Sequence, residues 1–203
     1  MKKFNQLVLL SLFIVICTAC QYSENNLISR PDSQTAPQLS LNTPPKRAYH
    51  LMVYDSYRQV VVMFGGRDGL EEAFGDTWEY DGQGWRQIET VESPPTRYGH
   101  GMVFDSNRNV TVLYGGVASL SQRFADTWEY DGENWFLRDG LSKTPGGREF
   151  PIMIFDPSRQ ATLLLVGAML DDMWSYNGEE WQKTSIVVPP PIRFAITTSA
   201  GIL

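Results

Sequence analysis

A seven-residue segment, Asp-Thr-Trp-Glu-Tyr-Asp-Gly, occupies residues 76–82 and again 126–132, and a degraded copy occupies 172–178. In each copy a second tryptophan follows the first by seven residues, and these three pairs account for all six tryptophans of the chain. A repeat with a period near 50 residues is typical of architectures in which each unit buries its apolar surface against its neighbours. The chain is therefore predicted to be a series of equivalent units, and the repeat argues against a simple active site.

Each unit contains four short apolar runs separated by residues that favour turns. In the first unit the runs are 51–54, 60–64 and 77–80, and a fourth begins at Trp85. An Asp starts a tight turn after the first run, and Asp-Gly or Asn-Gly ends the third, as in hairpins. The first run is continuously apolar, which predicts a strand buried on both faces, and the fourth fades into polar residues like an outer strand. Each unit is predicted to be a four-stranded antiparallel sheet with its strands in chain order.

A double glycine, a Trp-x-Tyr pair and a distal tryptophan recur together at matching spacing, and this combination resembles the Kelch repeat. The third copy departs, because Val166-Gly167 replaces the double glycine and the following loop is shorter. The matching positions are Gly65, Gly66, Trp78, Tyr80 and Trp85 in the first unit, Gly115, Gly116, Trp128, Tyr130 and Trp135 in the second, and Trp174, Tyr176 and Trp181 in the third. The resemblance covers roughly residues 46–190 and implies that each unit is a blade of a β-propeller, as in the central domain of galactose oxidase. The expected fold is all-β.

The number of units predicts an incomplete propeller. Three blades are expected at about 44–93, 94–144 and 145–188, followed by the start of a fourth, and residues 38–41 match an orphan outer strand. Propellers usually have about four to eight blades. We therefore expect exposed blade faces at both ends, either covered by self-association or left by truncation of a larger Kelch protein.

Residues 1–20 have the pattern of an export signal. Two lysines precede a short apolar stretch at 7–16, and the segment ends at Cys20, which resembles a bacterial lipoprotein signal in which this cysteine is lipidated. Cys17 departs from that pattern, and the alternatives are an ordinary signal peptide or an uncleaved anchor. The resemblance implies a cell-envelope protein bound to a membrane through its N-terminal lipid. Because residue 21 is Gln, the outer membrane is expected in a bacterium with two membranes, facing either the periplasm or the outside. Residues 21–43 are predicted to form a flexible tether.

The composition excludes several classes of function. The formal net charge is -6, and a mature chain starting at Cys20 loses two lysines and no acids, which disfavours binding to nucleic acid. Only Cys20 would remain after cleavage, so no intramolecular disulfide is expected. Two histidines about fifty residues apart make a poor metal site, and the Tyr-Cys crosslink of Kelch-type copper oxidases lacks its cysteine here. We expect neither a metal nor a cofactor.

Residues that recur in every unit are interpreted as structural. His50 and His100 occupy equivalent positions and are expected to make a shared structural hydrogen bond. The arginines are expected to pair with an acid or a carbonyl at the junctions, and the alternative is a ring of guanidiniums that binds a carboxylated ligand. The aspartates before the third run are expected to act in turns or as strand caps, and the alternative is a pair of carboxylates for acid and base catalysis. The two sets are Arg47, Arg97, Arg148 and Arg193, and Asp76, Asp126 and Asp172.

The loops between the second and third runs differ between units, at 67–75, 117–125 and 168–171. Variable loops on a rigid scaffold commonly carry recognition. The candidate ligand contacts are Arg67, Asp68, Glu71, Glu72 and Arg123. The expected function is a non-catalytic binding module for protein or carbohydrate. The alternatives are a sugar-handling enzyme, such as a Kelch propeller of the mutarotase or epimerase kind, and a truncated remnant of a larger Kelch protein.

Overall fold

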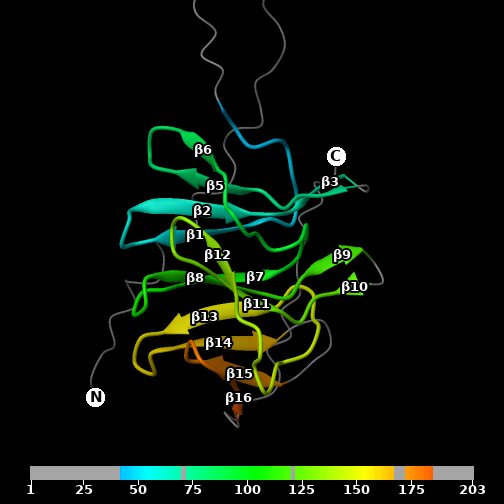
Figure 1. The fold of residues 1–203 in the computed structure, drawn as a ribbon, viewed down its shortest axis with the longest axis vertical. Coiled ribbons are helices and arrows are strands. Elements are labelled where there is room, and N and C mark those ends of the chain that lie inside the picture. Colours follow the sequence, from blue (N-terminus) through cyan, green and yellow to red (C-terminus); the bar gives the residue numbers. More distant parts are fainter. Residues whose placement is uncertain (1–41, 70–71, 120–121, 167–171, 185–203) are drawn as a thin grey trace, which may run out of the picture. The chain divides into compact units, whose positions relative to one another are not determined.

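The computed structural model describes residues 42–69, 72–119, 122–166 and 172–184. Within these ranges the chain is all-β, with three four-stranded antiparallel sheets and no helix (Figure 1). The predicted signal and tether up to residue 41, with the lipidation candidate Cys20 and the strand at 38–41, lie outside the described residues. The start of a fourth unit, after residue 184, also lies outside them.

Each repeat unit forms one sheet, and its four main strands lie side by side in chain order. The first sheet contains β1 (Leu51–Asp55), β2 (Val60–Phe64), β5 (Thr77–Tyr80) and β6 (Trp85–Ile88). The second contains β7 (Gly101–Asp105), β8 (Val110–Tyr114), β11 (Thr127–Tyr130) and β12 (Trp135–Leu137). The third contains β13 (Ile152–Asp156), β14 (Ala161–Val166), β15 (Met173–Tyr176) and β16 (Trp181–Thr184). The predicted four-stranded antiparallel units are confirmed.

The turn between the first two strands of a unit is built by its aspartate. In the first sheet, Asp55 Oδ1 accepts hydrogen bonds from the backbone N–H groups of Tyr57 and Arg58, both at 2.9 Å. Gln59 then adopts a φ of 60°, the left-handed conformation that closes the turn before β2. The equivalent residues of the other units, Asn109 and Gln160, have φ values of 58° and 50°. The tight turns predicted after the first run are thus confirmed.

Two short hairpins lie where the sequence predicts loops. β3 (Arg67–Asp68) pairs with β4 (Glu72–Ala73), and β9 (Val117–Ser119) pairs with β10 (Gln122–Arg123). They lie at the same end of the first and second sheets in Figure 1. Each hairpin also bridges the segment that leads into the first strand of its unit, through Ala48 to Arg67 and Tyr98 to Val117. Strands of two or three residues are too short for a recognisable alternation of apolar and polar residues.

The double glycine allows adjacent units to approach closely. Gly115 has a φ of 69°, and a Cβ atom at this position would lie 2.7 Å from the backbone oxygen of Arg148. Gly65 has a φ of 63°, and its Cβ would lie 2.6 Å from the backbone oxygen of Arg97. Both the left-handed backbone and the lack of space therefore require glycine. The backbone of the following unit packs directly against these positions.

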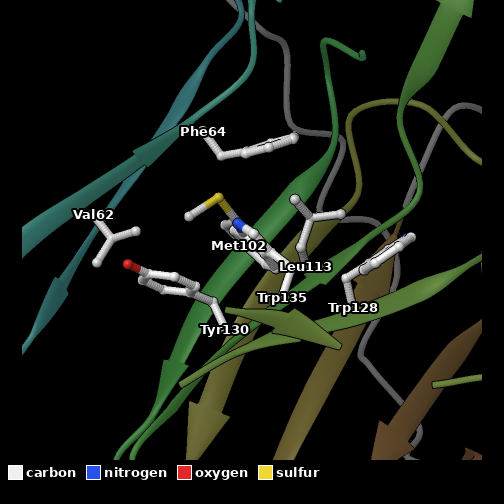
Figure 2. Packing of buried hydrophobic residues seen from close by; sticks show 7 residues of the cluster. All are labelled: Val62, Phe64, Met102, Leu113, Trp128, Tyr130 and Trp135. Atoms are coloured by element: carbon white, nitrogen blue, oxygen red, sulfur yellow. The ribbon is translucent and has the colours of Figure 1, made fainter. Parts of the chain in front are cut away.

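The sheets pack face to face in chain order and bury two apolar cores. Figure 2 shows the first core, in which Val62 and Phe64 of β2 point toward Met102, Tyr130 and Trp135 of the second sheet. The second core is formed in the same way by the second and third sheets, with Val112, Tyr114, Met153, Leu164, Tyr176 and Trp181. The aromatic residues of the repeat therefore pack between units as well as within them.

The prediction that the first run is buried on both faces is wrong for the first sheet. Met52 and Tyr54 of β1 are 51% and 57% exposed. Their equivalents in β7, Met102 and Phe104, are buried. Among the described residues, the second sheet packs against a sheet on each of its faces, whereas the first sheet packs against a sheet on one face only. The side chains on the other face of β1 are therefore exposed.

Candidate functional site

The repeated arginines and aspartates are partners of one another. In the second sheet, Arg97 is fully buried and its two terminal nitrogens donate to the two carboxylate oxygens of Asp126, each at 2.7 Å. Arg97 also donates to the backbone oxygens of Gly115 at 2.9 Å and Pro95 at 3.0 Å. The guanidinium stacks on Phe124, 3.9 Å from the ring centroid. A buried charge is therefore matched by a bidentate ion pair and further hydrogen bonds.

The same pair recurs in the other two units. Arg47 donates to both carboxylate oxygens of Asp76 at 2.6 and 2.7 Å, and Arg148 donates to Asp172 at 2.9 Å. The predicted pairing is confirmed for Arg47, Arg97 and Arg148, and Arg193 lies outside the described residues. The predicted turn or cap role of the aspartates is wrong, because their carboxylates accept from the arginine and from the indole N–H of the tryptophan two residues later.

The protonation state of these aspartates suits ion pairing. Burial raises the pKa of Asp126, but hydrogen bonds and charge from Arg97 and the hydrogen bond from Trp128 outweigh that effect and bring the pKa below its ordinary value. The pKa of Asp76 is lowered by the corresponding contacts with Arg47 and Trp78, again against the effect of burial. Both carboxylates are therefore ionised at neutral pH and fully engaged, which leaves neither of them suited to proton transfer.

The two histidines do not make the shared hydrogen bond that the sequence predicts. His100 is buried, and within the described structure neither of its ring nitrogens has a hydrogen-bond partner. The ring instead packs edge-to-face on Phe64 of the preceding unit, with centroids 5.6 Å apart. His50 is less buried, and its Nδ1 also lacks a partner among the described residues. His100 therefore acts as a packing residue between two units.

His100 makes the stability of the protein sensitive to mild acid. Burial, followed by the charges of Arg97 and His50, lowers the pKa of His100 to about 3. An unfolded chain takes up this proton near pH 6.5, so between about pH 6.5 and 3 the unfolded state binds more protons and acidification favours it. We expect His100 to reduce the free energy of unfolding by up to about 1.4 kcal/mol per pH unit in this window.

Urea titrations between pH 7 and pH 4 test this expectation by comparing the natural chain with His100→Phe, which keeps an aromatic ring without the titration. The variant should lose less stability on acidification. His50→Phe serves as the control. Burial and the charge of Arg47 also lower the pKa of His50, but this side chain is only half-buried, so its replacement should change the pH profile less. Parallel profiles for the natural chain and His100→Phe would contradict the assignment.

Arg67 differs from every other arginine in the described part of the chain, because its side chain has neither an ion pair nor a hydrogen bond there. Its guanidinium lies instead beside two tyrosine rings, 4.5 Å from the centroid of Tyr98 and 5.0 Å from that of Tyr49. Its Nε atom is buried without a partner. The cation is held in place by aromatic rings and keeps unused donors.

Two exposed aromatic side chains lie next to each other here, and of these Tyr49 contacts Arg67 while Phe150 packs on Tyr49. Tyr49 is 43% exposed and Phe150 is 36% exposed, and their ring centroids lie 5.6 Å apart in an edge-to-face arrangement. Both have left-handed backbones, with φ values of 58° and 52°, which are uncommon for bulky residues. Gly99, at the equivalent position of the second unit, accepts from Phe150 N at 2.6 Å and donates to Tyr49 O at 3.0 Å. Three successive units thus combine to form this surface, which we call the Arg67 cluster: Arg67, Tyr49, Tyr98 and Phe150.

The other sequence-derived candidates lie on the two hairpins. Asp68 follows Arg67 on β3 and faces Glu72 on β4. Its carboxylate accepts a hydrogen bond from the backbone N–H of Glu72 at 3.2 Å. Arg123 lies on β10 of the next unit and pairs with Glu149 at 3.0 Å. Glu71 lies outside the described residues. The structure therefore places Arg67, Asp68 and Glu72 on one hairpin and Arg123 on another.

Sequence reasoning missed the aromatic members of the Arg67 cluster. Tyr49, Gly99 and Phe150 follow the repeated arginine by two residues in each unit. The available signal was this single repeat position, which holds a large aromatic residue in the first and third units and a glycine in the second. Packing alone would not require so large a difference in side-chain size.

The described residues contain no group of three or more His, Cys, Asp or Glu side chains placed to hold a metal ion. In the same ranges, the chain forms no helix long and apolar enough to span a membrane. Comparison with protein families and with curated proteins gives no match. Any functional conclusion therefore depends on the geometry of the site itself.

Proposed function

We propose that this chain is an exported, lipid-anchored protein of Kelch-type propeller blades that binds a protein ligand and performs no catalysis. The blade assignment is supported by the recurrence of the double glycine, the Trp-x-Tyr pair and the distal tryptophan in three stacked four-stranded sheets. The anchor is supported by the pattern of residues 1–20, which ends at Cys20. Attachment at the cell envelope, in the outer membrane where there are two membranes, would present the sheets to ligands outside the cytoplasm.

The observation that carries the binding proposal is the contrast between Arg67 and the repeated charged residues. The repeated arginines and aspartates are engaged in internal ion pairs, which accounts for their recurrence. Arg67 is peculiar to one unit, has no acid partner among the described residues and lies between aromatic rings. A positioned cation without a structural partner is available to a ligand.

The side chains of the Arg67 cluster favour a protein over a carbohydrate as that ligand. Tyrosine and arginine are enriched among the residues that contribute most to protein–protein binding energy, and interface cores are enriched in aromatic residues. Tyr49 and Phe150 would supply apolar contact area, and Arg67 would supply a charge-assisted hydrogen bond to a carboxylate or carbonyl of the partner. Asp68 and Glu72 lie on the same hairpin and would contribute at the rim.

The test is a binding experiment with Arg67→Ala. The full chain, purified in detergent, is applied to an array of purified secreted and envelope proteins and to a glycan array, and each hit is titrated. We expect protein hits whose Kd rises at least about tenfold in Arg67→Ala, the scale of one lost charge-assisted hydrogen bond in a desolvated contact. A hit confined to the glycan array would contradict the choice of ligand class.

Arg123→Ala is the matched control, because Arg123 occupies the other hairpin but already pairs with Glu149. It should change the Kd less than Arg67→Ala. Both variants should melt like the natural chain, since neither arginine makes a contact that the cores depend on. Equal loss of binding in the two variants would mean that net charge, rather than the Arg67 cluster, determines binding.

A further inference from the structure

Tyr49 and Phe150 have a backbone conformation that side chains of their size disfavour. Their φ values are 58° and 52°, in the left-handed region where a bulky residue meets steric conflict and a glycine does not. The equivalent residue of the second unit, Gly99, has a φ of 59°, so this repeat position has the same conformation in all three units. Glycine would satisfy the backbone in each unit, and the aromatic residues of the first and third units therefore cost stability.

Packing inside the protein does not account for this cost. Neither Tyr49 nor Phe150 belongs to the two apolar cores, and both side chains remain partly exposed. The Phe150 ring rests on Gly99, where a Cβ atom would lie 2.9 Å from the ring, but its outer part stays accessible. Backbone strain at residues that the cores do not require is typical of binding and catalytic sites.

The two strained rings extend an apolar surface away from the cation of the Arg67 cluster. Arg67 packs on the buried ring of Tyr98, 4.5 Å from its centroid, and on the exposed ring of Tyr49 at 5.0 Å. Tyr49 in turn contacts Phe150, with the two centroids 5.6 Å apart. Tyr98 thus holds the guanidinium in place, and an exposed ring pair lies directly beside it.

The charges around Arg67 favour a ligand group with a single negative charge. Within the described residues the Arg67 guanidinium makes no ion pair, and its Nε atom is buried without a partner. Asp68 and Glu72 are exposed on the same hairpin. A phosphate group carries nearly two negative charges at neutral pH and is repelled by nearby acids, whereas a carboxylate matches the fork of one guanidinium. The group bound by Arg67 is therefore a carboxylate.

We infer that the protein ligand is recognised through a segment that presents two side chains to the Arg67 cluster. An aspartate or glutamate binds Arg67, and a bulky apolar side chain two residues away packs on Tyr49 and Phe150. Side chains two residues apart lie on one face of an extended segment, about 6–7 Å from each other, which is close to the 5.0 and 5.6 Å between neighbouring groups of the cluster. Tyr49 and Phe150 then determine which segments bind, a role that rests on the binding function proposed above.

A phage-displayed library of short random peptides, selected against the full chain in detergent, tests this inference. We expect the enriched peptides to carry an acid within two residues of a phenylalanine, tryptophan or leucine. The Kd of a synthetic copy should rise at least about tenfold for Arg67→Ala and for Phe150→Gly. Changing the peptide's acid to its amide should weaken binding to the natural chain but not to Arg67→Ala, and changing its apolar residue to alanine should do so for the natural chain but not for Phe150→Gly.

Urea unfolding distinguishes a binding role of the two rings from a structural one. Tyr49→Gly and Phe150→Gly should unfold close to the natural chain, because relief of the left-handed backbone offsets the partial burial that is lost. Gln59→Gly is the matched control, since it relieves a φ of 60° at an exposed turn residue outside the cluster. It should leave the peptide Kd unchanged.

Three results would overturn the inference and leave the binding function of Arg67 in place. These are a fall of more than about 1 M in the urea midpoint of either aromatic variant, peptide binding that depends on Arg67 but not on Phe150, and Arg67-dependent protein hits for which no acidic and apolar peptide is enriched. If neither a peptide nor a protein binds in a way that depends on Arg67, the proposed function fails, and the inference fails with it.

Discussion

Replacement of Arg97 by alanine is expected to lower the free energy of unfolding by about 3–5 kcal/mol, the cost of breaking a buried ion pair by removing one partner. Arg97 is fully buried and satisfies both carboxylate oxygens of Asp126 together with two backbone carbonyls. Alanine leaves a largely buried carboxylate with one remaining side-chain donor, Trp128. It also leaves a cavity beside Phe124, on which the guanidinium stacks.

Arg86→Ala is the control for the loss of an arginine at a surface position. Arg86 also pairs with a carboxylate, Glu79 at 3.1 Å, but its side chain is 73% exposed. Exposed ion pairs contribute less than about 1 kcal/mol, so this variant should unfold close to the natural chain in a urea titration. Similar losses for the two variants would show that the Arg97 pair is not a buried structural element. Arg97→Lys should fall between them, because lysine keeps the charge but not the bidentate geometry.

The sequence contained enough information to predict the sheets and their strand order. Turn residues such as Asp55 and Gly82 recur at fixed offsets, and short-range turn chemistry is determined locally. The Arg97–Asp126 pair was also within reach of sequence reasoning. Both residues recur after 50 residues between the first and second units, and two repeated charges of opposite sign in one unit are natural partners.

The exposed site was less accessible to prediction, because it depends on contacts between units. Arg67 was identified as a variable residue, but its partners Tyr49 and Tyr98 belong to different units of the chain, and Phe150 to a third. Only the stacking of the sheets brings them together. The His100 result has the same origin, since its ring packs on Phe64 of the preceding unit and not on its own.

Equivalent sequence positions also differ in burial, and the tryptophans show how much this matters. Trp135 is 1% exposed, packs on Phe64 and Tyr130 at centroid distances of 5.2 and 5.1 Å, and donates to Thr77. Trp85, in the same sequence context, is half-buried and packs on Tyr80 with the two rings tilted by 42°. The repeat predicts one role for both, whereas the structure gives Trp135 a neighbouring sheet that Trp85 lacks among the described residues.

Trp135→Ala is therefore expected to reduce the free energy of unfolding by about 3–5 kcal/mol, the usual cost of truncating a large buried aromatic side chain. Trp85→Ala should reduce it by about 1 kcal/mol, the scale of a single partly exposed aromatic pair. Urea titration of the two single variants measures the difference between their losses in free energy of unfolding. Because Trp85 and Trp135 lie in the same local sequence, this difference reports the packing between the first and second sheets. Equal losses would mean that each tryptophan stabilises the protein mainly through contacts within its own sheet. The packing between sheets would then not be the main source of the stability that Trp135 contributes.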